Sequence, residues 1–262
     1  MNTALISKIA AEVGTPFYLY SEQRLRQNFQ AFADAVKTLK KATVCFAVKS
    51  NFNPTILKIL AGMGAGADIV SGAELELALQ AGVPANKIVF SGVGKTRAEL
   101  TAAIQAGIKQ INAESESEIR LIDDIALELG KTAAVGIRVN PDVDARTHEK
   151  ITTGKKENKF GIDWNDAYRL FLSAEQFKGV SLHGIEVHVG SQILDLEPFR
   201  EAFVKTKKML TALKDKGVLL QTVDVGGGLG VAYKADESAP SPADYIAVLQ
   251  DVFGDFDGEF VF

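Results

Sequence analysis

Short apolar runs alternate with segments in which apolar residues return every three or four positions, and the alternation continues along almost the whole chain. The first pattern predicts buried β-strands and the second predicts amphipathic helices. In segment 22–40, for example, Leu25, Phe29 and Phe32 fall on one helical face. The predicted strands are 43–48, 67–71, 87–91, 110–113, 133–140, 181–188, 222–225 and 259–262. The predicted helices are 22–40, 55–62, 72–82, 96–107, 116–129, 164–173, 196–217 and 241–253.

Three of the predicted strand-to-helix joins carry the same polar signature. A serine or threonine stands three positions before a glutamate at 71–74, 96–99 and 115–118. This is the spacing of the capping box, in which a hydroxyl and a carboxylate satisfy free amides at a helix start. The chain therefore passes repeatedly from a strand into a helix, which predicts a parallel sheet covered by helices.

The number and order of these elements predict an α/β fold, an eight-stranded parallel (β/α)8 barrel of the TIM type. The order starts with a helix and ends with strand 259–262, so we expect helix 22–40 to take the place of the eighth helix. We expect residues 21–262 to form the barrel and residues 1–20 to form an extension with a strand outside it. An open, doubly wound sheet is the alternative architecture.

The composition is that of an ordinary globular protein and excludes several classes of partner. The chain has 262 residues, 47% of them hydrophobic, and a net charge of −4 without a basic run, so we expect no nucleic-acid or membrane partner. The longest uncharged stretch, 77–86, is too short to span a bilayer. Lys8 and Glu12 interrupt the N-terminus, and the single Cys45 fits a reducing compartment; both favour a cytoplasmic protein.

Lys49 ends the first predicted strand and is followed by the polar segment 50–54. A buried ammonium loses solvent, which lowers its pKa, and a lysine that can lose its proton is a nucleophile able to form a Schiff base. The alternative is a structural lysine that reaches from the strand end into water. Lys49 is therefore the first candidate for covalent chemistry.

A cluster of glycines follows the seventh predicted strand, at Gly226, Gly227, Gly228 and Gly230. Glycines let the backbone approach a ligand closely and turn its amides toward an anion. Barrels often bind phosphate after strands seven and eight. The cluster lacks the Gly-Lys-Ser/Thr of a Walker loop and matches the Rossmann pattern poorly. A phosphate site and a tight barrel turn are the two interpretations.

His188 and Ser191 lie where the sixth predicted strand ends. Strand alternation places His188 on one face with Gly184 and Glu186, while His183 points away and is interpreted as structural. An imidazole at the mouth can stack on a flat cofactor, and the serine hydroxyl can donate to phosphate. A structural histidine bonded to the loop is the alternative. Three histidines without paired spacing predict no metal site.

Arg138 lies in apolar company at the end of the fifth predicted strand. A buried guanidinium needs a partner, and either a cofactor or a glutamate can supply one. The long polar connection 141–163 that follows is predicted to lie on the face where barrels keep their active sites, either as a functional loop or as a solvated excursion.

Together these candidates predict a cofactor with an aldehyde for the lysine, a flat ring for the histidine and a phosphate for the glycines. Pyridoxal 5'-phosphate meets all three requirements. A barrel that forms a Schiff base with its substrate and uses no cofactor is a further alternative, although its lysine more naturally sits on a later strand.

Several longer motifs resemble those of diaminopimelate decarboxylase, a family of alanine-racemase-like, fold-type III pyridoxal phosphate enzymes. The resemblance covers essentially the whole chain. The motifs are FAVKSN at 46–51, GADIVSGAEL at 66–75, FSGVGKT at 90–96, RVNPDVD at 138–144, TGKKENKFG at 153–161, HVGSQ at 188–192 and GGGLG at 226–230.

The resemblance implies roles for individual residues. Lys49 is implied to hold the cofactor covalently until the substrate amine displaces it, and His188 to stack on its ring. The implied reaction is decarboxylation of meso-2,6-diaminopimelate to L-lysine and CO2 by a cytoplasmic homodimer that acts on this small amino acid. The other cofactor-binding residues implied are Arg138, Ser191, Gly226, Gly227 and Gly228.

The chain also departs from the family pattern. Ser50 stands where the family usually has alanine, and the sequence stops at Phe262, where the family continues with Glu-Pro-Gly-Arg and a β-rich C-terminal domain. We therefore expect a barrel portion that binds the cofactor but decarboxylates poorly or not at all by itself. A single-domain pyridoxal phosphate carrier without decarboxylase activity is the alternative.

Overall fold

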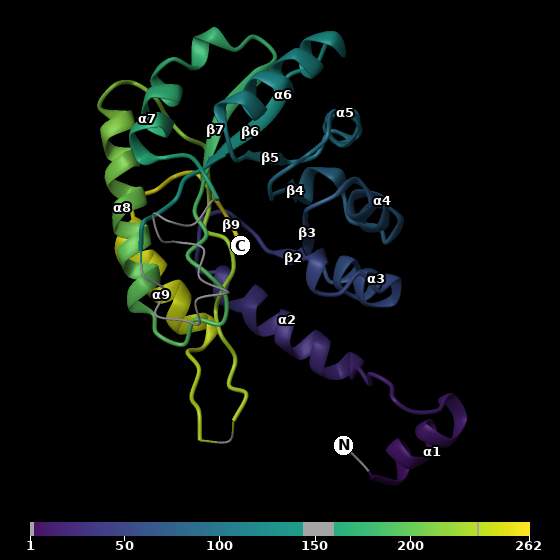
Figure 1. Ribbon diagram of the computed structural model, residues 1–262. Coiled ribbons are helices and arrows are strands. Elements are labelled where there is room, and N and C mark those ends of the chain that lie inside the picture. The colour runs from purple at the N-terminus through teal and green to yellow at the C-terminus, as the bar shows by residue number, and fades with distance from the viewer. Residues whose placement is uncertain (1–2, 144–159, 235) are drawn as a thin grey trace.

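The computed structural model describes residues 3–143, 160–234 and 236–262 and contains one sheet in which every pairing is parallel, with helices on the outside (Figure 1). The strands are β1 Ala42–Thr43, β2 Cys45–Ala47, β3 Gly66–Ile69, β4 Ile88–Phe90, β5 Gln110–Ala113, β6 Ala133–Arg138, β7 Val180–Glu186, β8 Thr222–Asp224 and β9 Glu259–Val261. The α-helices are α1 Thr3–Val13, α2 Glu22–Val36, α3 Pro54–Gly62, α4 Gly72–Gln80, α5 Arg97–Ala106, α6 Glu116–Glu128, α7 Trp164–Leu172, α8 Glu197–Lys214 and α9 Pro242–Phe253.

The sheet closes on itself because β1 and β2 together occupy one of the eight strand positions, or staves, of the barrel. β1 pairs with β9 and β2 pairs with β3, at the two ends of the strand order. At the break between β1 and β2, the Cys45 amide donates to the Phe262 carbonyl at 2.7 Å. The predicted eight-stave barrel is therefore confirmed and the open doubly wound sheet is wrong. The first strand, predicted as 43–48, is shorter, because residues Val48–Ser50 form a 3-10 turn.

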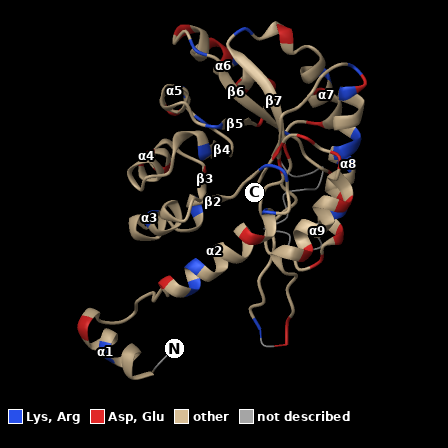
Figure 2. Cartoon of the chain, turned by 180° about the vertical axis from the view of Figure 1, so that it is seen from behind, with Lys and Arg blue, Asp and Glu red and all other residues tan. Residues whose placement is uncertain are grey.

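Helix α2 completes the outer ring, as predicted. It contacts α3 on one side and α9 on the other, so it fills the place of the eighth helix (Figure 1). Its Phe32 packs edge-on against Phe262, with ring centroids 5.6 Å apart. Charges of both signs are interspersed along α2 and α8 (Figure 2). No helix among the described residues is long and apolar enough to cross a membrane.

The prediction of an extra strand in residues 1–20 is wrong. Residues Thr3–Val13 form α1, which stands apart from the barrel and has no buried residue (Figure 1). Alanine, leucine and lysine favour a helix here, and Gly14, with φ of +81°, ends it. The apolar residues that suggested a strand, around Tyr18 and Tyr20, lie in irregular backbone and have no strand partner.

Of the three predicted capping boxes, the one at Thr96 forms and the other two form only in part. At Thr96 both halves of the box are present. At Ser71 and Ser115 the hydroxyl accepts from the expected amide, but the glutamate accepts from the amide just before the cap, as in the 2.7 Å bond from the Val70 amide to Glu74 Oε2. Each strand therefore passes into its helix through a rigid polar turn, which fixes the residues at the strand's carboxyl end.

Candidate active site

Most of the sequence-predicted residues lie at one end of the barrel, because parallel strands present all their carboxyl ends on the same face. Lys49 follows β2, Arg138 ends β6, and His188 and Gly226 follow β7 and β8. The charges of Lys49 and Arg138 both act on the His188 ring. The structure thus brings together the lysine, the histidine, the arginine and the glycines. Of the connection 141–163, residues 144–159 lie outside the described residues, and with them most of the motif at 153–161.

Lys49 lies at the mouth and is exposed, so it is not buried as one of the two interpretations requires. The 3-10 turn after β2 buries Val48 as its anchor and turns the next residue outward. The Ser50 hydroxyl closes this turn by donating to the Ala47 carbonyl at 2.7 Å. Burial raises the pKa of Asp68 on the neighbouring strand, and the charge of Lys49 is among those that partly offset this rise.

His188 presents a neutral imidazole. Burial, followed by the positive charges of Arg138 and Lys49, lowers the pKa of His188 to about 3. Its Nδ1 accepts from the Gly227 amide at 3.4 Å, which places the proton of the neutral ring on Nε2. The side chain is therefore an uncharged flat surface across the physiological pH range, and it is fixed to the glycine turn.

The glycine turn and the loop after β7 form a paired backbone cradle, residues 188–193 and 226–230. Gly226 and Gly228 have φ of +64° and +108°, and a Cβ on Gly228 would lie 2.1 Å from the Gly190 carbonyl oxygen. The Ile193 amide donates to the Gly228 carbonyl at 2.8 Å, and its carbonyl accepts from Gly230 at 2.9 Å. Only glycine fits at positions 226 and 228, so backbone amides line this part of the mouth.

Gln192 was quoted in a motif but given no role in the sequence analysis, and it fastens the cradle. Its φ is +56°, unusual for a residue with a side chain. The side-chain amide of Gln192 makes two hydrogen bonds to the backbone of Val231: Oε1 accepts from the Val231 amide at 3.1 Å, and Nε2 donates to the Val231 carbonyl. Ser191, exposed beside it, is thereby held at the edge of the glycine turn.

Two glutamates are partners of Arg138 in the structure. Its guanidinium lies 2.7 Å from Glu114 Oε1 and 3.7 Å from Glu186 Oε1. Burial opposes the charged form, but the two carboxylates outweigh it and raise the pKa of Arg138. Arg138 is therefore a fixed positive charge in the floor of the site.

Three carboxyl groups that the sequence analysis did not assign, Asp68, Glu186 and Asp224, also line the floor. Burial raises the pKa of all three, to about 8 for Glu186 and about 6 for Asp224. Within the described part of the chain, Asp68 Oδ1 and Glu186 Oε2 are buried without a hydrogen-bond partner. Such atoms are typical of a site that a bound group completes. The signal was available: each acid interrupts an apolar strand, as Arg138 does.

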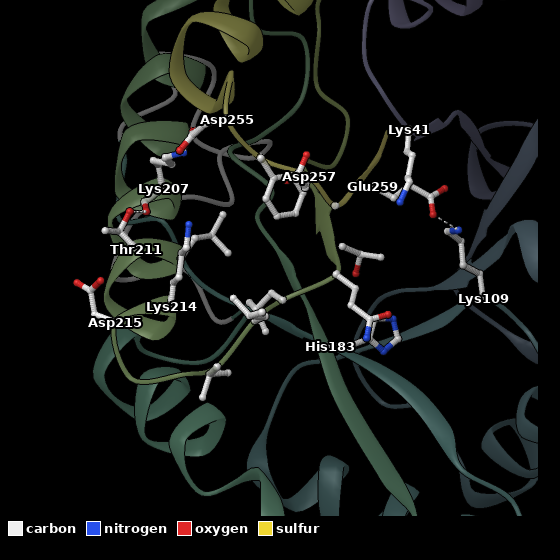
Figure 3. Close-up of a pocket in the computed structure, with 18 residues that line it drawn as sticks. Lys41, Lys109, His183, Lys207, Thr211, Lys214, Asp215, Asp255, Asp257 and Glu259 are labelled. Atoms are coloured by element: carbon white, nitrogen blue, oxygen red, sulfur yellow. Dashed lines mark hydrogen bonds and ion pairs between the residues drawn. The ribbon is translucent and has the colours of Figure 1, made fainter.

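Two cavities lie at opposite ends of the barrel. One of about 550 Å³ adjoins the glycine turn and is walled by Phe32, Tyr245 and Phe262. The larger, of about 900 Å³, is lined by Lys109, His183 and other residues at the amino ends of the strands (Figure 3). Of the candidate residues, Gly226, Gly227 and Gly228 line the smaller cavity, whereas Lys49, Arg138 and His188 are not part of its lining. We place the chemistry at the carboxyl end of the barrel, because the candidate residues gather there.

Comparison with known proteins identifies the family. Residues 22–259 match the family described as pyridoxal-dependent decarboxylase, pyridoxal binding domain. The chain belongs to this family. It is 44% identical over 247 residues to a diaminopimelate decarboxylase of Aquifex aeolicus, covering 94% of the chain and 58% of that protein. It is 46% identical to one of Pseudomonas fluorescens, covering 94% of the chain and 59% of that protein.

A solved structure agrees with this assignment. The diaminopimelate decarboxylase of Helicobacter pylori, complexed with L-lysine, superposes with a TM-score of 0.94 at 39% identity, covering 98% of this chain and 64% of that one. The chain thus spans roughly six tenths of the length of its relatives. A Schiff-base barrel without a cofactor, considered from the sequence, is wrong for a member of a pyridoxal-dependent family.

The residues at the mouth fit pyridoxal phosphate, the cofactor of this family. The cradle offers backbone amides where a side chain on Gly226 or Gly228 would collide with neighbouring atoms. The neutral His188 offers a flat face, Lys49 an accessible amine, and Asp68 and Glu186 unpaired oxygens. These are the groups needed for a phosphate, an aromatic ring, an aldehyde and polar ring substituents.

Proposed function

We propose that the protein decarboxylates meso-2,6-diaminopimelate to L-lysine and CO2, with this barrel holding the pyridoxal phosphate. The observation that carries the proposal is the convergence of Lys49, His188 and the glycine turn at one mouth, in a chain 44–46% identical to diaminopimelate decarboxylases. When bound, the cofactor supplies an electron sink for the carbon that loses its carboxylate.

In this proposal each residue has a distinct task. Lys49 would hold the cofactor covalently, because its amine can form a Schiff base with an aldehyde. His188 would offer the cofactor an uncharged flat surface, since burial and nearby cations keep the pKa of His188 near 3, as given above. Arg138, a fixed charge paired with Glu114 and Glu186, would hold the acidic floor in place. Ser191 and the glycine turn at Gly226, Gly227 and Gly228 bind the phosphate.

The attachment of the cofactor is tested with Lys49→Ala. The protein is incubated with pyridoxal phosphate and dialysed, and the visible absorbance of the retained cofactor is recorded. We expect Lys49→Ala to lose this absorbance and Lys58→Ala, an exposed lysine on α3, to keep it. Unchanged absorbance in Lys49→Ala would show that another residue is the anchor.

A carrier protein that binds pyridoxal phosphate without turnover is the second candidate, because such a role needs only the barrel. The two are separated by supplying diaminopimelate and measuring L-lysine and CO2, with the chain alone and with the C-terminal region of a matched relative added. L-lysine formation in either case rejects the carrier. Cofactor binding without L-lysine in both cases rejects the decarboxylase.

We also infer a cytoplasmic homodimer. The resemblance to the family implies the dimer, and the single, partly buried Cys45 is compatible with a reducing compartment. Sedimentation equilibrium of the holoprotein tests the dimer, and fractionation of the source cells tests the compartment. A monomer at micromolar concentration, or recovery in the exported fraction, contradicts the respective inference.

A further inference from the structure

A hydrogen-bonded row of four buried polar side chains crosses the inside of the barrel between β5 and β8. Thr222 Oγ1 donates to Gln110 Oε1 at 2.5 Å, and Gln110 Nε2 donates to Asn112 Oδ1 at 2.6 Å. Asn112 Nδ2 then donates to Asp224 Oδ2 at 2.8 Å, on the same strand as Thr222. All four residues are at most 5% exposed. Two strands separated by β6 and β7 are therefore linked directly across the interior.

Two glycines on the strands in between make room for this row of side chains. A Cβ on Gly136 of β6 would lie 2.4 Å from Gln110 Nε2. A Cβ on Gly184 of β7 would lie 2.2 Å from Thr222 Oγ1. Any side chain at either position would displace the amide of Gln110. The two glycines thus leave a space in which one arrangement of the hydrogen-bonded row fits.

The row of side chains ends at the glycine turn. Asp224 uses both carboxylate oxygens: Oδ2 accepts from Asn112, and Oδ1 accepts from the Gly226 amide at 3.0 Å. The second hydrogen of Asn112 Nδ2 goes to Ser91 Oγ at 3.1 Å, and Ser91 in turn bonds to Asp68. Each amide group has one orientation that satisfies its partners, so Asn112 fixes the direction of the Asp224 carboxylate.

We propose that Asn112 is a positioning residue that, through Asp224, holds the Gly226 turn in the conformation that binds the cofactor phosphate. Without the Asn112 amide, Asp224 Oδ2 is buried with no donor, and the carboxylate is free to turn away from the Gly226 amide. The effect falls mainly on the phosphate end of the cofactor, since Asp224 holds the Gly226 amide directly, whereas His188 follows β7 and contacts the turn only through the Gly227 amide at 3.4 Å. The inference rests on the proposed phosphate role of the glycine turn.

The test compares pyridoxal phosphate with pyridoxal, which lacks only the phosphate. Dissociation constants for both are measured by fluorescence titration of the apoprotein. The dissociation constant of pyridoxal divided by that of pyridoxal phosphate reports the phosphate contribution alone. We expect Asn112→Leu to reduce this ratio about tenfold or more, as for one lost bond to a charged group. The control is Thr206→Val, which removes a buried hydroxyl bonded within α8 to the Ala202 carbonyl, and we expect it to leave the ratio unchanged.

A purely structural role predicts a different result. It lowers the affinity for both compounds equally in Asn112→Leu, and an unchanged ratio in the folded variant overturns the proposal. If Asn112→Leu does not fold, Asn112→Ser, which retains one donor, is measured in its place and judged by the same ratio. A wild-type ratio near one shows instead that the glycine turn is not the phosphate site. A high wild-type ratio without L-lysine formation contradicts only the proposed reaction.

Discussion

Replacing Gly228 by alanine tests the backbone cradle most directly. The φ of Gly228 is +108°, a conformation that alanine adopts only under strain. The added methyl would lie 2.1 Å from the Gly190 carbonyl oxygen, which belongs to the facing loop of the cradle. Because this atom is backbone, no side-chain rotation relieves the contact. One of the two loops must move.

The cost follows from the contacts that the movement breaks. Backbone strain at such a φ contributes about 1–3 kcal/mol. Losing the 2.8 Å bond from the Ile193 amide to the Gly228 carbonyl adds about 1 kcal/mol. We therefore expect the apoprotein to lose about 2–4 kcal/mol of its free energy of unfolding. Displacing one amide from the phosphate weakens cofactor binding by roughly tenfold to a hundredfold.

Urea unfolding of the apoprotein measures the stability, and titration with pyridoxal phosphate measures the affinity. Gly130→Ala is the matched control, since Gly130 also has a positive φ, +60°, but a Cβ there meets no atom within 4 Å. We expect that control to lose about 1–2 kcal/mol of stability and no cofactor affinity. If Gly228→Ala is destabilised but binds pyridoxal phosphate as the wild type does, the cradle does not bind the phosphate.

Three further predictions concern the buried charges. Arg138→Met leaves the Glu114 carboxylate buried without its cation, so we expect a loss of about 3–5 kcal/mol in urea unfolding at neutral pH. A loss below about 1 kcal/mol contradicts the ion-pair assignment. Lys95→Met removes the partner of Glu118 and of the Asn112 carbonyl, and we expect a similar loss in the free energy of unfolding. The exposed pair of Arg97 with Glu128 should contribute under about 1 kcal/mol by the same measurement. The pKa of Glu186 is raised to about 8, so the folded apoprotein retains a proton that the unfolded chain has released. The free energy of unfolding therefore falls as pH rises from 6 to 8, by up to about 1.4 kcal/mol per pH unit. Glu186→Gln should flatten this slope in urea titrations at several pH values.

Much of the fold could be predicted because its signals are local. Strand β5 was predicted with the bounds observed, and α6 with a difference of one residue at its end, since hydrophobic period and capping residues are read within a few positions. The N-terminal segment failed for the same reason. Its apolar residues near Tyr18 look like a strand locally, but a strand needs a neighbour in the sheet, and none is there.

The candidate site was predictable where a residue type is unusual for its surroundings, as with Lys49, Arg138 and the glycines. It was not predictable where the function of a residue depends on a partner far along the chain. Asn112 and Asp224 are 112 positions apart, and nothing local in the sequence shows that their side chains meet. Lys49 illustrates a third limit: its place at a strand end was clear, but the 3-10 turn that exposes it depends on the packing of Val48.

The split first stave has a consequence for how the protein is made. Its outer edge, at β1, pairs with β9, so residues 42–45 are held by residues 260–262. During synthesis the first stave leaves the ribosome early, and its partner emerges some two hundred residues later. Until then the nascent sheet has an open edge at β1, the kind of edge that invites pairing with other chains. Closure is therefore a late event, and a slow or interrupted translation should leave β1 as the segment most exposed to aggregation.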